Sequence, residues 1–168
     1  RSGGKSAGIY RSLNCGLGSS DKKKNILKNL EIVRRKIGPD SRKIILPNQT
    51  HSAKFNYLDK KIRLNNNKFF GDALITNRIN TPIGVLTADC VPILIYDKEM
   101  KMAAAIHAGW KGAYKNIVKK VLKFMITKGC RPINITAAIG PCISLKNYEI
   151  KQDFIKKFIT KDRNNRIF

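Results

Sequence analysis

Long apolar runs are missing from this chain, and so are the marks of a secreted, disulfide-rich protein. No apolar stretch approaches the roughly 18 residues that a membrane-spanning helix needs. The opening Arg-Ser-Gly-Gly-Lys-Ser has no apolar segment of a secretory signal. The four cysteines form no CxxC pair and follow no regular spacing, so we expect reduced thiols. These absences favour a cytoplasmic protein with no membrane partner.

Acidic residues are also scarce. Eleven Asp and Glu stand against 34 Lys and Arg, which gives a formal net charge of +23. A charge of this size attracts anions, and on one face it would be the footprint of a nucleic-acid-binding protein. The lysines are instead spread along the whole chain among many asparagines and isoleucines, a mixture typical of codon bias across a genome. We therefore expect small anionic substrates rather than specific nucleic-acid binding, and the oligomeric state stays unknown.

Apolar residues are plentiful enough for one independent domain. They make up 42% of the 168 residues and fall in periodic segments, which indicates a globular fold rather than a disordered chain. A chain of this length buries a core without disulfides or a structural metal. No linker or internal repeat divides it, so we predict a single domain over residues 1–168.

Apolar periodicity predicts alternating strands and helices outside a central hairpin. Helices are predicted from a cap at Ser19, Ser20 or Asp21 to a stop at Gly38-Pro39, over 113–128 and over 153–160. Strands are predicted over 9–13, 43–46, 55–58, 61–64, 72–76, 83–87, 134–139 and 148–150, with a polar loop at 65–68 and a frayed tail at 161–168. This order indicates an α/β fold, a layered mixed β-sheet core flanked by helices.

The stretch from Thr87 to Gly112 carries the most chemical information. It predicts a β-hairpin with strands over 91–96 and 101–106 and a turn over 97–100. Because the strands of a hairpin run antiparallel, the residue before the first strand lies beside the end of the second. We therefore expect Cys90 and His107 to be neighbours.

The chain has only two histidines, His51 and His107, and both stand beside glycine- or proline-rich turns. Together with Cys90 they offer two nitrogens and one sulfur, a donor set that suits zinc and leaves a fourth position open for water or substrate. Taken singly, each residue has a structural explanation, since buried cysteines often fill core space. The three together predict a catalytic zinc site.

A rival hypothesis uses the same side chains without a metal. Cys90 would be a thiolate nucleophile and His107 its base, with Asp89 or His51 orienting the imidazole ring. This arrangement would make the protein a Cys-His hydrolase. The sequence leaves both hypotheses open.

Residues around the hairpin have functional and structural alternatives of their own. Asp89 is a candidate proton carrier or a simple turn acceptor, and Lys111 is a candidate phosphate ligand or a solvated lysine. Trp110 could stack on a flat ring or fill the core. Cys142, after Gly-Pro, suits packing better than ligation. Two glycines after His107 allow the backbone to approach a ligand with no Cβ in the way.

Taken together, these motifs closely resemble the YfiH-like family, also called the polyphenol oxidoreductase laccase-domain family. The matching segments span nearly the whole chain in the family's order: Arg1-Ser-Gly-Gly-Lys-Ser, Tyr10 to Leu17, Gln49-Thr-His51-Ser, Asp72 to Thr76, Thr87 to Pro92, Ile106 to Gly112, Ile139 to Ile143 and Tyr148-Glu149. The combination of segments is more specific than any one of them.

The resemblance implies a layered α/β fold and a zinc ion held by His51, Cys90 and His107. It also implies phosphorolysis of adenosine, inosine or methylthioadenosine, and deamination of adenosine, with purine nucleosides and phosphate as partners. Copper is the less favoured metal. An oxidase with several copper ions needs many imidazoles, and two histidines with one thiol do not supply them.

For those reactions, Cys90, His107 and Asp89 are the predicted catalytic residues. Asp89 would carry a proton during attack on C6 of adenosine. Arg1, Asn14 and Lys111 are the predicted phosphate ligands, since a glycine-rich loop and a helix N-terminus supply amide donors nearby.

The sequence departs from the family pattern at both ends and at one position of the site. Family members begin with a strand before the position of Arg1 and continue past residue 168 through a Cys-Thr pair and a Ser-Tyr-Arg-Arg-like run. Lys111 stands where arginine is usual, which keeps the charge but loses the planar fork that suits phosphate. A truncated remnant that binds nucleosides without catalysis is therefore an alternative.

Overall fold

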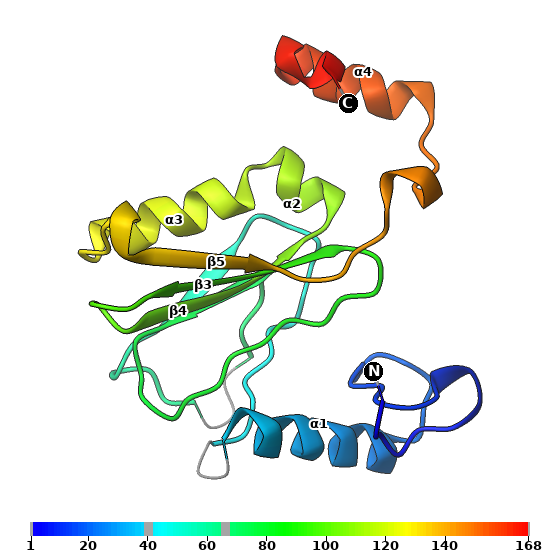
Figure 1. Ribbon diagram of the computed structural model, residues 1–168, viewed down its shortest axis with the longest axis vertical. Coiled ribbons are helices and arrows are strands. Elements are labelled where there is room, and N and C mark those ends of the chain that lie inside the picture. Colours follow the sequence, from blue (N-terminus) through cyan, green and yellow to red (C-terminus); the bar gives the residue numbers. More distant parts are fainter. Residues whose placement is uncertain (1, 39–41, 65–67, 168) are drawn as a thin grey trace.

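A computed structural model describes residues 2–38, 42–64 and 68–167 of the chain (Figure 1). Four predictions fall partly outside these ranges, at Arg1, at Pro39 of the helix stop, at residues 65–67 of the loop and at Phe168 of the tail. The described strands form one mixed sheet in the order β1-β2-β4-β3-β5. Their bounds are β1 Phe55–Leu58, β2 Ala73–Thr76, β3 Val91–Asp97, β4 Met102–Ala108 and β5 Ile135–Ile139. The predicted α/β class is confirmed.

The predicted hairpin is formed by β3 and β4. The two strands pair antiparallel, with Val91 opposite Ala108 and Pro92 opposite His107. Because Cys90 immediately precedes Val91, it lies at the same edge of the sheet as His107, as the sequence predicts. On its other side β4 pairs antiparallel with β2, so β4 is the central strand.

Two helices follow β4 and cover one face of the sheet (Figure 1). They are α2 (Trp110–Tyr114) and α3 (Ile117–Thr127), where the sequence predicted one helix over 113–128. The break falls at Asn116, whose φ of 56° is left-handed. Beyond it, α3 buries its apolar stripe against the sheet. The buried residues of this main core are Ala53, Ala73, Ile75, Ile95, Met102, Ala104, Ile106, Ala108, Ile117, Val121, Met125 and Cys130.

The opposite face carries a smaller core and the N-terminal part of the chain. Leu58, Phe69 and Leu74 are buried there under partly buried apolar residues: Ile45, Ile62, Leu64 and Ile83. Helix α1 (Lys23–Ile37) lies on this side in Figure 1. It holds the N-terminal loop through its buried Asn29, whose side chain bonds to Lys5 N, Ser6 Oγ and Asn14 O. The layered arrangement of the prediction is therefore observed.

The last helix, α4 (Gln152–Lys161), packs on α2 through aromatic side chains. Trp110 and Phe154 have ring centroids 5.2 Å apart, and so do Tyr114 and Phe158. This helix agrees with the prediction over 153–160. Short 3-10 helices lie at Gly8–Tyr10, Pro132–Asn134, Leu145–Asn147 and Arg163–Ile167. The last of these lies within the tail that was predicted to be frayed.

Several predicted strands are wrong. Residues 9–13, 43–46, 61–64, 83–87 and 148–150 form no strand. Between 43–46 and 83–87 there is only an isolated bridge, Ile45 to Ile83. Strand β1 pairs in parallel with β2 and not with residues 61–64. In three of these segments the apolar residues cover Leu58 and Leu74 as irregular chain: Ile45, Ile62, Leu64 and Ile83. A short apolar run does not distinguish a strand from a packed loop.

The predicted cap of α1 is also wrong. The residue at the N-cap position is Lys22, and no side chain caps the helix. Asp21 instead accepts bonds from Ser6 Oγ and Asn14 Nδ2, and therefore helps to close the N-terminal loop. None of the described helices is both long and apolar enough to cross a bilayer.

The packing of α3 on the sheet predicts a strong position dependence of stability. Ile117 is fully buried, whereas Ile126 of the same helix is 46% exposed. We expect Ile117→Ala to lower the free energy of unfolding by about 2–5 kcal/mol, because it leaves a cavity in the main core. Ile126→Ala makes the same chemical change at the surface and should cost less than about 1 kcal/mol. Urea unfolding of the two variants measures both values, and equal losses would contradict the packing described here.

Candidate metal centre

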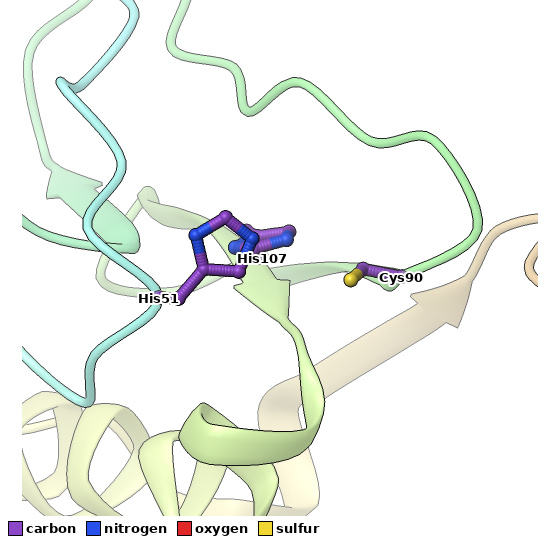
Figure 2. Close-up of side chains that lie close together, drawn as sticks. All are labelled: His51, Cys90 and His107. Atoms are coloured by element: carbon purple, nitrogen blue, oxygen red, sulfur yellow. The ribbon is translucent and has the colours of Figure 1, made fainter. Parts of the chain in front are cut away.

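Three side chains from separate parts of the chain converge at one edge of the sheet (Figure 2). His51 lies on the loop before β1, Cys90 on the loop that enters β3, and His107 within β4. Their ligand atoms all lie within 4.8 Å of one another. The two imidazole rings are perpendicular, with centroids 5.0 Å apart. The three residues that the sequence predicted as metal ligands are thus brought together.

Asp72, immediately before β2, fixes the ring of His107. Both residues are buried, and Asp72 Oδ1 lies 2.9 Å from His107 Nδ1. The backbone N–H of His107 also donates to the carbonyl oxygen of Asp72, at 2.7 Å. A carboxylate accepts hydrogen bonds, so the ring proton of neutral His107 lies on Nδ1 and the lone pair on Nε2. Nε2 is therefore the atom available to a metal.

The same carboxylate holds the loop that carries His51. Asp72 Oδ1 accepts the backbone N–H of His51 at 3.0 Å, and Oδ2 accepts the N–H and Oγ of Ser52 at 2.6 and 2.8 Å. Thr50 adds longer bonds of 3.3 Å from its N–H and Oγ1. His51 has a left-handed φ of 53°, which a non-glycine residue keeps only when its surroundings fix it. The bonds to Asp72 provide that constraint.

The environment of Asp72 keeps its carboxyl group ionised. Burial raises the pKa of Asp72, but the hydrogen bonds from Ser52, His107 and Thr50 outweigh burial, and the pKa lies below its ordinary value. A negative charge therefore sits directly behind the two histidines. Such a charge favours the binding of a cation in front of them.

A glutamine links the loop that carries His51 to the loop that carries Cys90. Gln49 Nε2 donates to the carbonyl oxygen of Leu86 at 2.8 Å, and the Leu86 N–H donates to Gln49 Oε1 at 2.7 Å. The loop from Leu86 leads to Cys90 four residues later. This two-bond clamp, together with Asp72, sets the mutual positions of all three candidate ligands.

Gly109 leaves room at the centre of the triad. A Cβ built at this position would lie 3.3 Å from Cys90 Sγ, 3.4 Å from His107 Cε1 and 3.5 Å from His51 Cδ2. Its φ of −70° is open to any residue, so the need is for space and not for backbone freedom. The glycine allows close approach of the backbone, as expected from the sequence. The donor set of two imidazole nitrogens and one thiol fits one tetrahedral zinc ion. The space beside Gly109 leaves room for it.

The thiol of Cys90 is in a poor setting for a metal-free nucleophile. Burial raises the pKa of Cys90, and the negative charges of Asp89 and Asp72 raise it further. Among the described residues, no hydrogen bond joins the thiol to either imidazole ring. A nucleophilic cysteine needs a base within hydrogen-bond reach or a lowered pKa. The geometry therefore supports the metal hypothesis over the Cys-His hydrolase.

The other predicted residues near the hairpin lie on the surface. Asp89 is exposed and has a left-handed φ of 74°, and its carbonyl oxygen accepts the N–H of Ile143. Lys111 is exposed on α2 with its Nζ 5.6 Å from the centre of the Trp110 ring. Trp110 is 39% exposed and packs against Phe154, so it does not fill the core as its structural alternative predicted. The helix that follows Gly109 has only five residues, fewer than predicted.

Three predicted residues remain: Asn14, Arg1 and Cys142. Asn14 uses its whole side chain within the N-terminal loop: Nδ2 donates to Ser19 and Asp21, and Oδ1 accepts the Gly16 N–H. Arg1 is outside the described residues. Cys142 is exposed and is not among the clustered ligand atoms.

Sequence reasoning missed the roles of Asp72 and Gln49. Asp72 directly precedes the buried run Ala73–Thr76, and an acidic residue beside a buried strand requires several donors. That signal was available. The partner of Gln49 is a backbone group 37 residues away, and nothing in the local sequence indicates it.

Comparison with known families assigns the chain to one of them. All of residues 1–168 match the family described as multi-copper polyphenol oxidoreductase laccase. The chain belongs to this family. The match confirms the resemblance drawn from the sequence motifs. The donor set of this laccase-family chain, two imidazoles and one thiol, suits a single ion rather than a copper cluster.

Relatives of this laccase-family chain include proteins named purine nucleoside phosphorylase. One from Bacteroides thetaiotaomicron is 34% identical over 165 residues, which cover 94% of this chain and 61% of that protein. Another from Aquifex aeolicus is 39% identical over 141 residues, which cover 82% of this chain and 65% of that protein. The chain thus spans less than two thirds of the length of these relatives.

Solved structures of the family share the fold. The crystal structure of a hypothetical protein YfiH from Bacillus licheniformis has a TM-score of 0.84 and 29% identity, covering 93% of this chain and 61% of that one. YlmD from Geobacillus stearothermophilus has a TM-score of 0.82 and 25% identity, covering 94% and 61%. The layered sheet with its flanking helices is therefore the fold of this laccase family.

The convergence of the triad predicts metal binding that depends on Cys90. We expect the wild-type protein to take up one zinc ion and Cys90→Ala to weaken zinc binding by more than about 100-fold, because loss of a ligand costs more than loss of an outer partner. Competition with a chromophoric chelator measures the affinity. Cys142→Ala removes an exposed thiol outside the triad and should leave the affinity unchanged. Equal affinities of the two variants would refute the site.

The space beside Gly109 leads to a second prediction about zinc binding. Gly109→Ala keeps an allowed backbone but places a methyl group against all three ligand residues. We expect zinc affinity to fall at least about 10-fold, while the thermal unfolding midpoint of the metal-free protein changes little. Gly18→Ala, at a position with no atom within 4 Å of the added Cβ, is the control and should bind zinc normally. A Gly109→Ala protein with normal affinity would show that the space is not needed.

Proposed function

We propose that this chain binds one zinc ion through His51, Cys90 and His107 and uses the site to act on purine nucleosides. The observation that carries the proposal is the convergence of their three ligand atoms within 4.8 Å of one another. Zinc is favoured over copper because two nitrogens and one sulfur suit its tetrahedral geometry. Three protein ligands leave one coordination position for water or substrate.

The substrate class rests on the family relationship. Relatives that are 34% and 39% identical are named purine nucleoside phosphorylase. We propose phosphorolysis of adenosine, inosine or methylthioadenosine, and deamination of adenosine as a second reaction at the same site. Both reactions act on a neutral nucleoside, and phosphorolysis adds an anion that the net charge of +23 attracts.

The residues around the triad have separate tasks in this proposal. When bound, zinc supplies Lewis acidity at its open coordination position. Asp72 holds His107 in the tautomer that presents Nε2. Asp89, exposed beside Cys90, is the candidate that carries a proton to or from the purine ring. The proposed catalytic residues are therefore Cys90, His107 and Asp89.

Phosphate recognition is assigned to two basic residues, Arg1 and Lys111, and to Asn14. Lys111 is exposed two residues after Gly109 and therefore close to the triad along the chain. Arg1 and Asn14 remain candidates from the sequence motifs. Because the Asn14 side chain is occupied by Ser19, Asp21 and Gly16, it would act on phosphate only by exchanging one of these partners. Of the three residues, Lys111 has the strongest support as a phosphate ligand.

A nucleoside assay tests the proposal directly. Zinc-loaded protein incubated with adenosine and phosphate should release adenine and, through deamination, inosine and hypoxanthine, all separable by chromatography. Cys90→Ala and His107→Ala should each lower turnover by more than about 100-fold, since the chemistry is assigned to the shared metal. Cys142→Ala is the control and should retain full turnover.

Each outcome of that assay has a distinct meaning. Unchanged turnover in Cys90→Ala or His107→Ala would reject the shared metal site. The Cys-His hydrolase would be favoured by two results together: alkylation of Cys90 in the metal-free protein, and turnover that persists in the presence of a chelator. No product at any zinc concentration, with retained nucleoside binding, would favour a binding protein without catalysis.

A further inference from the structure

One buried carboxylate contacts both histidine arms of the candidate metal centre. Asp72 is fully buried, and its Oδ1 accepts hydrogen bonds from His107 Nδ1 and from the backbone N–H of His51. Its Oδ2 accepts the N–H and hydroxyl groups of Thr50 and Ser52. The two arms belong to different elements, a loop and a central strand. Asp72 is the contact that they share.

We propose that Asp72 is the positioning residue of the site: it sets the ring tautomer of His107 and the left-handed backbone of His51 before the metal arrives. The inference rests on the proposed metal site and adds to it a residue that binds no metal itself. It explains why an ionised carboxylate is kept in a buried position, where an unpaired charge is costly. The hydrogen bonds that its two oxygens accept hold the segments that carry His51 and His107.

The substitution Asp72→Asn separates this role from simple packing. The amide keeps the size and shape of the carboxylate but has one acceptor and one donor end. Four donors from Thr50 and Ser52 face Oδ2, so the amide oxygen is expected on that side. The amide NH2 then faces His107 Nδ1, which must become an acceptor, and the backbone N–H of His51, which loses its acceptor. The ring proton moves to Nε2, and the atom assigned to the metal loses its lone pair.

A matched control exists at the far end of the same hairpin. Asp97 is also fully buried and accepts three backbone N–H groups, those of Glu99, Met100 and Arg131. It ends β3, whereas Cys90 precedes that strand. Asp97→Asn therefore removes a buried, hydrogen-bonded carboxylate of the same kind without touching the triad. Any general loss of stability should appear in both variants.

The experiment combines two readouts on wild type, Asp72→Asn and Asp97→Asn. The ring nitrogens of 15N-histidine-labelled, metal-free protein report the tautomer by NMR, and only two histidines contribute signals. Zinc affinity is measured by chelator competition. In Asp72→Asn we expect His107 to carry its proton on Nε2 and zinc affinity to fall about 10–100-fold, the usual effect of losing an outer partner of a ligand. Asp97→Asn should match wild type in both.

The two readouts keep this inference distinct from the metal proposal. The role of Asp72 would be overturned if the Asp72→Asn protein folds like the Asp97→Asn protein and retains the wild-type tautomer of His107 and the wild-type zinc affinity. If wild type takes up no zinc, the proposed function fails, and the tautomer of His107 in Asp72→Asn still decides whether Asp72 sets the ring. A Co(II)-loaded protein gives a further check, since its visible spectrum should change in Asp72→Asn and not in Asp97→Asn.

Discussion

The pairing of β4 with strands on both sides is the constraint on which the site depends. On one side the register with β3 places Pro92 opposite His107, so that Cys90 lies at the same edge. On the other side the pairing with β2 is extended by the bond from His107 N–H to the carbonyl oxygen of Asp72. Because side chains alternate across a strand, a slip of one residue would turn His107 to the other face of the sheet.

Charge is distributed differently at the site and over the whole protein. The chain carries a net charge of +23, yet the carboxylates of Asp72 and Asp89 lie close enough to the triad to raise the pKa of the Cys90 thiol. The local negative charge suits a cation, whereas the net positive charge of the whole chain attracts anions. Hydrogen bonds that lower the pKa of Asp72 maintain this local field, and they also fix the two histidine arms. One network therefore serves both geometry and electrostatics.

Strong periodicity and turn chemistry made much of the fold predictable. The hairpin of β3 and β4, the strands β1, β2 and β5 and the helices α1 and α4 agree with the prediction in type and position. The runs around Ile45 and Ile83 were misassigned because they form irregular chain that covers Leu74, and their apolar residues look the same in either state. The break at Asn116 depends on one left-handed residue that periodicity does not detect.

The sequence by itself determined which side chains could bind a metal, since it offers only two histidines, and it placed Cys90 beside His107 through the local rule of the hairpin. Only the tertiary structure brought His51 to them, because that contact depends on a loop held by Asp72, which immediately precedes β2. Only the tertiary structure assigned positions to Asp72 and Gln49, whose partners lie 20 to 37 residues away. Local patterns follow from backbone geometry, whereas long-range hydrogen bonds form when the sheet assembles.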